Sequence, residues 1–285
     1  MSREIPFTKM VGAGNDFLIV DAVHRRFGSL KAQWPAVARA MCDRRYGIGA
    51  DGLLILEASR GADCRMRIFN PDGSEAEMCG NGARCAAGFV HRWNGHRREV
   101  SIDTAGGLVT AQVLGARVRM AMPQPRDLKL HLHIKLDGQL WPLGYVDTGV
   151  PHAVAVVRRV EEVNVMQVGR RLRFHPEFHP RGTNVDFIEI SHANPDRLKI
   201  RTYERGVEGE TLACGTGVTA AAVIHALTGA DGGTATRRIT VETKSGETLT
   251  VSLRVSGEGE TRRVSDVILE GAVRWVCQGR FAGRI

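Results

Sequence analysis

The chain has 285 residues, of which 43% are hydrophobic and 25% charged, an ordinary composition for a globular protein. No apolar run reaches the roughly 20 residues that a helix needs to cross a bilayer. The first six residues do not resemble a secretory signal. We therefore predict a cytoplasmic protein with one large domain or two modest ones. A cytosolic chain of this length does not need disulfide staples and would keep its six cysteines reduced. They include no Cys-x-x-Cys pair, which disfavours structural zinc.

The net charge of +8 requires nucleic-acid binding to be considered. Lys and Arg are scattered along the sequence, however, and their clusters are short. Neither a basic tail nor a stripe of interleaved aromatic residues is found in the sequence. We expect a solvated basic surface, with neither nucleic acid nor membrane as a partner.

Short apolar runs and alternating segments predict strands in the first half of the chain, and longer apolar segments predict helices. We expect a strand at 17–20, a helix at 33–41, strands at 52–56 and 64–70, a turn at 71–74, a helix at 81–93, and strands at 98–104, 108–114 and 117–122. The segment 105–107 would form a hairpin turn.

Residues 122–127 contain two prolines and resemble a linker, after which the plan recurs. We expect strands at 141–148 and 153–157, a helix at 163–172, strands at 183–190 and 197–203, a helix at 216–227, strands at 238–243 and 247–254, and a last strand near 272–276 that returns to the first domain. The small-residue helix of each half is apolar around its circumference, so a sheet should enclose it.

These repeats predict an α/β protein of the α+β type with two similar, pseudo-symmetric domains. Each domain would be a curved sheet around a central helix, and the active-site cleft would lie between the domains. The N-terminal domain would comprise residues 1–123 plus about 273–285, and the C-terminal domain residues 124–272.

A Cys-Gly-x-Gly sequence precedes the small-residue helix in each half, at Cys79 and at Cys214. A thiol just before a helix gains acidity from the helix N-terminus, and the backbone N–H groups that follow can bind an anion. We expect the pKa of both thiols to fall below the free value of about 8.5. A substrate carboxylate would lie on the N–H groups of Gly80, Asn81, Gly215 and Thr216.

Two such thiols suit inversion at a carbon next to a carboxylate, without a cofactor. One thiolate would remove the proton from one face of the carbon, and the other thiol would deliver a proton to the opposite face. The negative charge that develops on the carbon would face two positive helix ends.

Longer motifs around the cysteines resemble those of diaminopimelate epimerases. Residues 78–85 are similar to the first active-site motif of that family, residues 203–207 and 210–217 to the second, and residues 9–17 to its N-terminal signature. Shorter matches follow in the family's order at 49–52, 70–74, 151–152 and 182–185. The resemblance extends from Lys9 to the last strand.

The resemblance implies a homodimeric epimerase, without cofactor or metal, that interconverts LL- and meso-2,6-diaminopimelate on the route to lysine and peptidoglycan precursors. It implies that Cys79 and Cys214 are the acid/base pair and that His152 and Glu204 tune their pKa. The substrate-binding residues that it implies are Asn15, Asn70, Gly80, Asn81, Asn184, Glu204, Arg205, Gly215 and Thr216.

The sequence departs from the family's pattern at three places. Val150 stands where the family often has an asparagine, so that amide contact is lost or replaced. An extra residue within 207–210 enlarges the loop before the second cysteine. Gly52 stands where some members carry a glutamine that contacts the substrate.

Two other functions stay open. A related two-thiol racemase would act on proline or hydroxyproline, although Glu204 and Arg205 favour a longer, doubly zwitterionic substrate. A thiol-redox protein would join Cys79 and Cys214 in a reversible disulfide, which would also inactivate an epimerase.

Several other side chains have ordinary structural interpretations. We expect the remaining cysteines to be buried, His175 and His179 to lie in a loop, and His131 and His133 to be exposed on a strand; the remaining cysteines are Cys42, Cys64, Cys85 and Cys277.

Overall fold

The computed structural model describes residues 4–229 and 234–283, and these form two compact units. Unit 1 contains residues 4–120 and 271–283, and unit 2 contains residues 121–229 and 234–270. Residues 1–3 and 284–285 of the predicted N-terminal domain, and 230–233 of the predicted C-terminal domain, lie outside the described residues. No helix among the described residues is long and apolar enough to cross a membrane.

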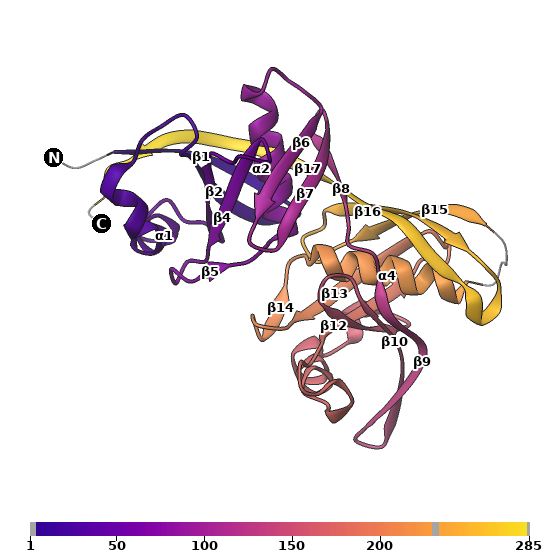
Figure 1. The fold of residues 1–285 in the computed structure, drawn as a ribbon. Coiled ribbons are helices and arrows are strands. Elements are labelled where there is room, and N and C mark those ends of the chain that lie inside the picture. Colours follow the sequence, from indigo (N-terminus) through magenta and orange to yellow (C-terminus); the bar gives the residue numbers. More distant parts are fainter. Residues whose placement is uncertain (1–3, 230–233, 284–285) are drawn as a thin grey trace. The chain divides into compact units, whose positions relative to one another are not determined.

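Unit 1 is a curved sheet around one helix (Figure 1). Its strands are β1 (Ile5–Gly12), β2 (Asn15–Asp21), β3 (Gly52–Glu57), β4 (Cys64–Phe69), β5 (Glu75–Ala76), β6 (Glu99–Thr104), β7 (Gly107–Leu114), β8 (Arg117–Ala121) and the later part of β17 (Arg263–Phe281). The pairing runs β17–β1–β2–β3–β4–β6–β7–β8, and β8 pairs with β17 again, so the sheet closes on itself. Both described ends of the chain lie in this unit, where β1 runs beside β17 (Figure 1).

The central helix of unit 1 is α2 (Gly80–Trp93), which contacts β1, β2, β3, β4, β6 and β7. Its small side chains let the sheet approach closely: Ala83, Cys85, Ala86 and Ala87 are fully buried. The helix ends where Gly95 and His96 take left-handed backbone conformations, with φ of 76° and 59°.

A second helix, α1 (Trp34–Cys42), covers the other face of this sheet, after the 3-10 helix η1 (Gly28–Gln33). Its buried residues include Trp34, Val37, Ala38 and Met41, the i, i+3, i+4, i+7 spacing of an amphipathic helix. Burying each large apolar side chain contributes about 1.5–3 kcal/mol, so this stripe fixes α1 on the sheet.

Unit 2 repeats the arrangement. Its strands are β9 (Arg126–Leu136), β10 (Gln139–Asp147), β11 (Pro151–Val156), β12 (Asn184–Ile190), β13 (Arg197–Glu204), β14 (Gly209–Thr211), β15 (Ala235–Glu242), β16 (Thr248–Ser256) and the first part of β17. They pair in the order β9–β10–β11–β12–β13–β15–β16–β17. The enclosed helix is α4 (Gly215–Thr228), which is buried at every residue from Gly217 to Leu227. The prediction that a sheet encloses each apolar helix is therefore confirmed.

The two units share one topology. In unit 1 the consecutive pairs β1–β2, β2–β3, β3–β4, β4–β6 and β6–β7 are antiparallel, parallel, antiparallel, parallel and antiparallel. The pairs β10–β11, β11–β12, β12–β13, β13–β15 and β15–β16 of unit 2 follow the same sequence. In each unit the central helix also follows a short strand, β5 or β14. The structure thus shows the α/β, two-unit repeat that the two cysteine motifs indicated.

Most predicted elements are present, but several strands were missed or shortened, among them the short β5 and β14. β1 was not predicted, β9 begins inside the predicted linker, and β17 has 19 residues instead of a few around 272–276. Most side chains of the first half of β9 are exposed, so the apolar alternation that marks a half-buried strand is absent there.

The helix predicted at 163–172 is wrong in its first half. The chain forms the 3-10 helix η2 (Val160–Glu162), a π-helical turn η3 (Val165–Gly169) and only then the short α3 (Arg170–Arg173). The Asn164 side chain accepts from the Gln167 N–H and caps this turn. A Cβ on Gly169 would lie 2.6 Å from the Tyr203 Cβ, so glycine allows the turn to approach β13.

The cysteine prediction holds for Cys42, Cys64 and Cys85, which are buried, but is wrong for Cys277, which is exposed. The register between β1 and β17 shifts between Lys9, which pairs with Cys277, and Met10, which pairs with Trp275. Cys277 was expected to be buried only because free cysteines usually are, and its place in the strand was not considered.

The histidine predictions agree with the structure. His131 and His133 are exposed on β9. His175 and His179 flank the 3-10 helix η4 (Pro176–Phe178), which His175 caps.

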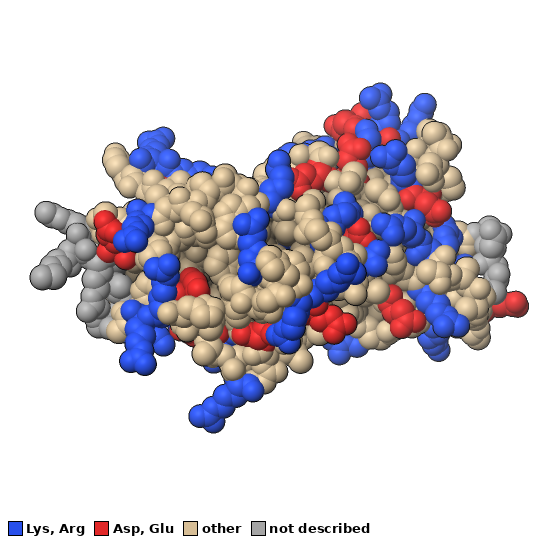
Figure 2. Space-filling view, turned by 90° about the horizontal axis from the view of Figure 1, so that it is seen from above, with Lys and Arg blue, Asp and Glu red and all other residues tan. Residues whose placement is uncertain are grey.

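The short 3-10 helix η5 (Gly259–Thr261) precedes β17. On the face seen in Figure 2, Lys and Arg side chains are interspersed with Asp and Glu.

Candidate active site

Cys79 is the residue from which α2 begins. Its backbone is extended, with φ −143° and ψ 117°, and its Sγ accepts from the Gly82 N–H at 3.5 Å. The thiol is half-buried and packs against the apolar cluster that contains Phe17 and Leu54. The N–H groups of a helix's first turn have no partner within the helix, so they can receive an anion beside this thiol.

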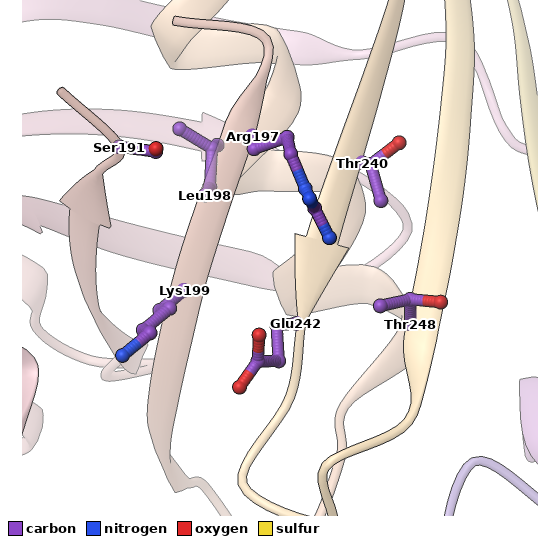
Figure 3. Close-up of a pocket in the computed structure, with 7 residues that line it drawn as sticks. All are labelled: Ser191, Arg197, Leu198, Lys199, Thr240, Glu242 and Thr248. Atoms are coloured by element: carbon purple, nitrogen blue, oxygen red, sulfur yellow. The ribbon is translucent and has the colours of Figure 1, made fainter. Parts of the chain in front are cut away.

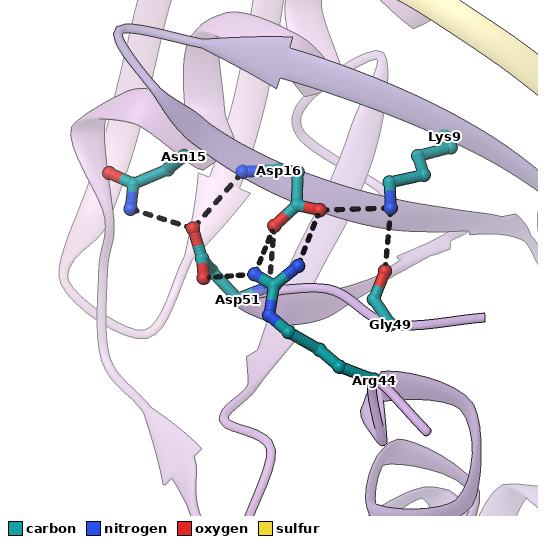
Figure 4. Close-up of polar contacts among 6 residues, drawn as sticks. All are labelled: Lys9, Asn15, Asp16, Arg44, Gly49 and Asp51. Carbon is teal, nitrogen blue, oxygen red and sulfur yellow. Dashed lines mark hydrogen bonds and ion pairs between the residues drawn. The ribbon is translucent and has the colours of Figure 1, made fainter. Parts of the chain in front are cut away.

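A polar network leads away from the start of α2, and Figure 4 shows its part from Asn15 to Lys9. The Asn81 Nδ2 donates to the Asn15 Oδ1 at 2.7 Å, and the Asn15 Nδ2 donates to Asp51 at 3.0 Å. Arg44 then binds Asp51 at 2.7 Å and Asp16 at 2.8 Å. Both ends of the Asn15 amide are therefore fixed, which orients one predicted substrate residue against another.

Asp16 is the charged centre of this network. Burial alone would raise its pKa, but hydrogen bonds and charge from Arg44 and Lys9 hold that pKa below its usual value. The Lys9 Nζ lies 2.9 Å from Asp16 and donates to the Gly49 carbonyl at 2.7 Å. Asp16, Arg44 and Asp51 were not predicted as site residues, although Asp16 and Asp51 lie inside the motifs that carried the family resemblance.

Asn70 lies immediately after β4 and is exposed. Its Nδ2 donates to the Ser74 Oγ at 3.0 Å, and its backbone N–H donates to the Ser74 carbonyl at 2.8 Å. The structure therefore shows Asn70 organising the predicted turn, and its contact with a substrate stays a prediction.

Cys214 is the residue from which α4 begins, with extended φ of −119° and ψ of 112°. Its thiol is buried, and its Sγ lies 3.3 Å from the Thr216 Oγ1. Burial raises the pKa of this thiol well above its ordinary value, and the charges of Glu204 and Asp186 add to the rise. The expectation of a lowered pKa is wrong for Cys214, because desolvation and two carboxylates outweigh the donors at the helix start.

A chain of hydrogen bonds runs from Cys214 into the core of unit 2. The Thr216 Oγ1 lies 3.0 Å from the His152 Nε2, and the His152 Nδ1 lies 2.7 Å from the Asp186 Oδ2. The other oxygen of Asp186 accepts from the Thr202 hydroxyl at 2.7 Å. His152 and Asp186 are both fully buried. Asp186 was missed, although a carboxylate between the apolar residues Val185 and Phe187 of β12 is a recognisable signal.

Asn184 fixes the turn that carries Glu204 and Arg205. Its Oδ1 accepts from the Arg205 N–H at 2.8 Å, and its Nδ2 donates to the Pro151 carbonyl at 2.9 Å. Burial raises the pKa of the Glu204 carboxyl. The Arg205 Nη1 donates to the Arg181 carbonyl at 3.2 Å.

The enlarged loop before Cys214 is anchored by Glu208. This residue has a left-handed φ of 54°, and its Oε1 accepts from the Gly206 N–H at 3.1 Å. Arg173 lies 3.1 Å from the same carboxylate. The loop that contains the extra residue is therefore closed by its own side chain.

Strand register gives the two half-sites equivalent positions. In unit 1, Phe17 of β2 pairs with Gly52 of the parallel strand β3. In unit 2, His152 of β11 pairs with Asn184 of the parallel strand β12. We take these two pairs as equivalent, so that Phe17 corresponds to His152 and Gly52 to Asn184. Counting along the strands from these pairs makes the following residues equivalent: Asn15 and Val150, Leu54 and Asp186, Asn70 and Glu204.

The helix starts support this equivalence independently of the register. A Cβ built on Gly82 would lie 3.3 Å from the Leu54 Cδ2, and one built on Gly217 would lie 2.5 Å from the Asp186 Oδ1. In each unit the glycine three residues after the cysteine therefore faces the same position of the third strand.

A hollow of about 220 Å³ on unit 2 lies elsewhere (Figure 3). Arg197, Leu198 and Lys199 line it, and Thr240, Glu242 and Thr248 face them from β15 and β16. Arg197 begins β13, whereas Glu204 ends that strand. None of the predicted site residues lines this hollow.

The sequence model of the family "Diaminopimelate epimerase" matches residues 7–126 and 144–271. The chain is 42% identical over 275 residues to the diaminopimelate epimerase of Chlorobaculum tepidum, covering 95% of this chain and 98% of that one. It is 38% identical over 287 residues to the diaminopimelate epimerase of Aquifex aeolicus, covering 98% of each. The chain belongs to the diaminopimelate epimerase family.

Solved structures of other proteins share the fold. A PhzF-family phenazine biosynthesis protein of Bacillus anthracis superposes with a TM-score of 0.69 at 17% identity, covering 98% of this chain and 99% of that one. A hydroxyproline epimerase of Agrobacterium vitis superposes with a TM-score of 0.66 at 17% identity, covering 98% and 92%. The fold of this chain is therefore also found in proteins that are not named diaminopimelate epimerases.

Proposed function

We propose that the chain interconverts LL- and meso-2,6-diaminopimelate by proton transfer between the Cys79 and Cys214 thiols, without a cofactor. The observation that carries the proposal is that each central helix begins at a cysteine in equivalent positions of the two repeats. Membership of the diaminopimelate epimerase family supports the substrate.

In one direction of the reaction, the Cys79 thiolate takes the proton from the α-carbon and becomes a thiol. Cys214 then gives its own proton to the opposite face of that carbon and becomes a thiolate. Burial raises the pKa of Cys214, which supports its starting as the acid in this direction. The reverse direction exchanges the roles.

The residues around each thiol would hold the two ends of the substrate. Gly80, Asn81, Gly215 and Thr216 would bind the carboxylate at the reacting carbon through the helix starts. At the distal end, Arg205 would bind the carboxylate, and Glu204 with the amide oxygens of Asn15, Asn70 and Asn184 would accept from the ammonium group. His152 and Glu204 would tune the thiols.

The larger organisation follows from the same proposal. Residues 1–123 plus about 273–285 would form one epimerase domain and residues 124–272 the other, each supplying one thiol. We propose a cytoplasmic homodimer that needs no metal and serves lysine and peptidoglycan-precursor synthesis.

The proposal is tested by incubating the reduced enzyme with LL-diaminopimelate in deuterated water. We expect the meso product to carry one deuterium, at the inverted carbon only, as read by mass spectrometry and chiral chromatography. Deuterium at both stereocentres, or inversion without deuterium, would contradict a two-base mechanism. Turnover of trans-4-hydroxy-L-proline in place of diaminopimelate would contradict the substrate assignment.

A further inference from the structure

The buried polar chain behind Cys214 is more extensive than tuning of a thiol requires. It joins Cys214, Thr216, His152 and Asp186 through consecutive contacts of 3.3, 3.0 and 2.7 Å. Thr216 lies in the first turn of α4, while His152 and Asp186 lie on the neighbouring strands β11 and β12. Since every step is within hydrogen-bonding range, a proton can move along the chain without any side chain leaving its place.

The equivalent positions of unit 1 carry no such chain. Leu54 stands where unit 2 has Asp186, and Phe17 where it has His152. Leu54 and Phe17 belong to the apolar cluster against which Cys79 packs. The repeated fold therefore does not by itself supply the side chains of this hydrogen-bonded chain.

We propose that Thr216 and His152 form a proton relay that ionises Cys214, and that Asp186 is the positioning residue that holds His152 for this task. The inference rests on the proposed function, which makes Cys214 a base in one direction.

The relay balances its protons. The Cys214 S–H donates to the Thr216 oxygen as the Thr216 O–H donates to the His152 Nε2. The S–H bond and the Thr216 O–H bond break, a new Thr216 O–H bond and an Nε2–H bond form, and Cys214 is left as a thiolate beside an imidazolium. Asp186 accepts the Nδ1–H throughout, which fixes the tautomer and offsets the charge of the imidazolium.

The charged groups around the thiol favour such a relay. Cys214 faces the Glu204 carboxylate from β13 and the Asp186 carboxylate from β12, and both oppose a thiolate. Among the four hydrogen-bonded residues, His152 of β11 is the group that becomes positive when the thiolate forms. Placing that positive charge two hydrogen bonds from the sulfur offsets the repulsion without exposing the thiol to water.

The test uses half-reactions, in which a single thiol removes and returns the α-proton without inverting the carbon. In a Cys79→Ala background, Cys214 alone exchanges the α-hydrogen of one isomer with deuterated water. In a Cys214→Ala background, Cys79 alone exchanges the α-hydrogen of the other isomer with deuterated water. Both isomers are assayed by mass spectrometry.

We expect Asp186→Asn to lower the Cys214-dependent exchange about 10²–10⁴-fold, the usual contribution of general acid–base catalysis, because the histidine would lose the carboxylate that orients it. The Cys79-dependent exchange should change less than about threefold, since Leu54 and Phe17 occupy the positions of unit 1 that are equivalent to Asp186 and His152. A merely structural role for Asp186 would lower both exchanges together, and that result would overturn the proposal.

A second pair of variants tests the relay without altering the buried carboxylate. Thr216→Val keeps the side-chain shape and the backbone N–H but removes the hydroxyl, whereas Thr216→Ser keeps the hydroxyl. We expect Thr216→Val to lower the rate of Cys214-dependent exchange. Thr216→Ser should exchange at least about tenfold faster than Thr216→Val, a difference within the usual range of general acid–base catalysis. Equal exchange in the two variants would overturn the relay.

Failure of the proposed function would give a different result. A wild-type chain that neither epimerises nor exchanges either isomer would overturn the function and the relay together. A wild-type chain that turns over normally, with Asp186→Asn unchanged in both backgrounds and in full epimerisation, would overturn the relay alone.

Discussion

The starts of α2 and α4 carry the same reactive atom in different surroundings. Cys79 is half-buried beside Phe17 and Leu54, whereas Cys214 is buried and is linked through Thr216 to His152 and Asp186. The backbone that presents the two thiols is the same in both repeats, down to the glycine three residues later. The difference teaches that a duplicated fold fixes where the sulfur lies, while a few strand residues decide how it is ionised.

The largest effect is expected from removing either thiol. Cys79→Ala and Cys214→Ala should each lower epimerisation by at least about 10³-fold, since each removes the acid or base for one face of the carbon. Chiral analysis of the product measures the loss, and circular dichroism checks that the fold is kept. If Cys214→Ala still inverted the carbon at near the wild-type rate, the comparison between the thiols would have no catalytic meaning.

A matched pair of glycine substitutions tests the surroundings of the two thiols. A Cβ at Gly217 would lie 2.5 Å from the Asp186 Oδ1 and must displace that carboxylate, whereas a Cβ at Gly82 would lie 3.3 Å from the flexible end of Leu54. We expect Gly217→Ala to lower kcat about 10²-fold, because a shift of about 1 Å is enough for such a loss. Gly82→Ala should retain more activity.

Urea denaturation of the same pair separates a fold defect from a catalytic one. Gly217→Ala should cost about 1–3 kcal/mol of unfolding free energy through overpacking, and Gly82→Ala less. Equal losses of activity in the two variants would show that the environments behind the helix starts do not differ in function.

The smallest effect is expected from Glu204, whose equivalent in unit 1 is Asn70. Burial raises the pKa of Glu204 above its unfolded value of about 4.5. The folded state therefore holds the Glu204 proton more tightly, and this contribution is fully present below the unfolded pKa and is lost as pH rises through the folded one.

Glu204→Gln should accordingly unfold at higher urea concentration than wild type at pH 7, with the difference shrinking as pH falls towards 4.5. The exposed Asn70 gives the control, since a carboxylate in Asn70→Glu stays hydrated and should leave the pH dependence nearly unchanged. A Glu204→Gln variant that is less stable than wild type at pH 7 would show that the buried carboxylate is stabilised there.

Local signals in the sequence predicted the thiols and helix positions well. Cys79 and Cys214 precede glycines and runs of small residues, and both helices begin within a residue of the predicted place. The predicted roles of Asn15, Asn81 and Asn184 came from motifs, and the structure adds that their amides are held by neighbouring groups.

The parts that could not be predicted depend on contacts distant in sequence. Asp186 meets His152 only because β11 and β12 run parallel, 34 residues apart in the sequence. The raised pKa of Cys214 arises from burial and from carboxylates on two other strands. A helix-start motif carries no information about either, so it predicted the wrong direction for that pKa.

The strand β17 has a consequence for how the molecule is assembled. Its first part pairs with β16 in unit 2, and its later part completes unit 1 by pairing with β1, while the Val273 N–H donates to the Ala116 carbonyl. The residues that close unit 1 thus follow all of unit 2 in the sequence. During synthesis, the strands β1 and β8 of unit 1 therefore keep unpaired edges until unit 2 and the later part of β17 have been synthesised.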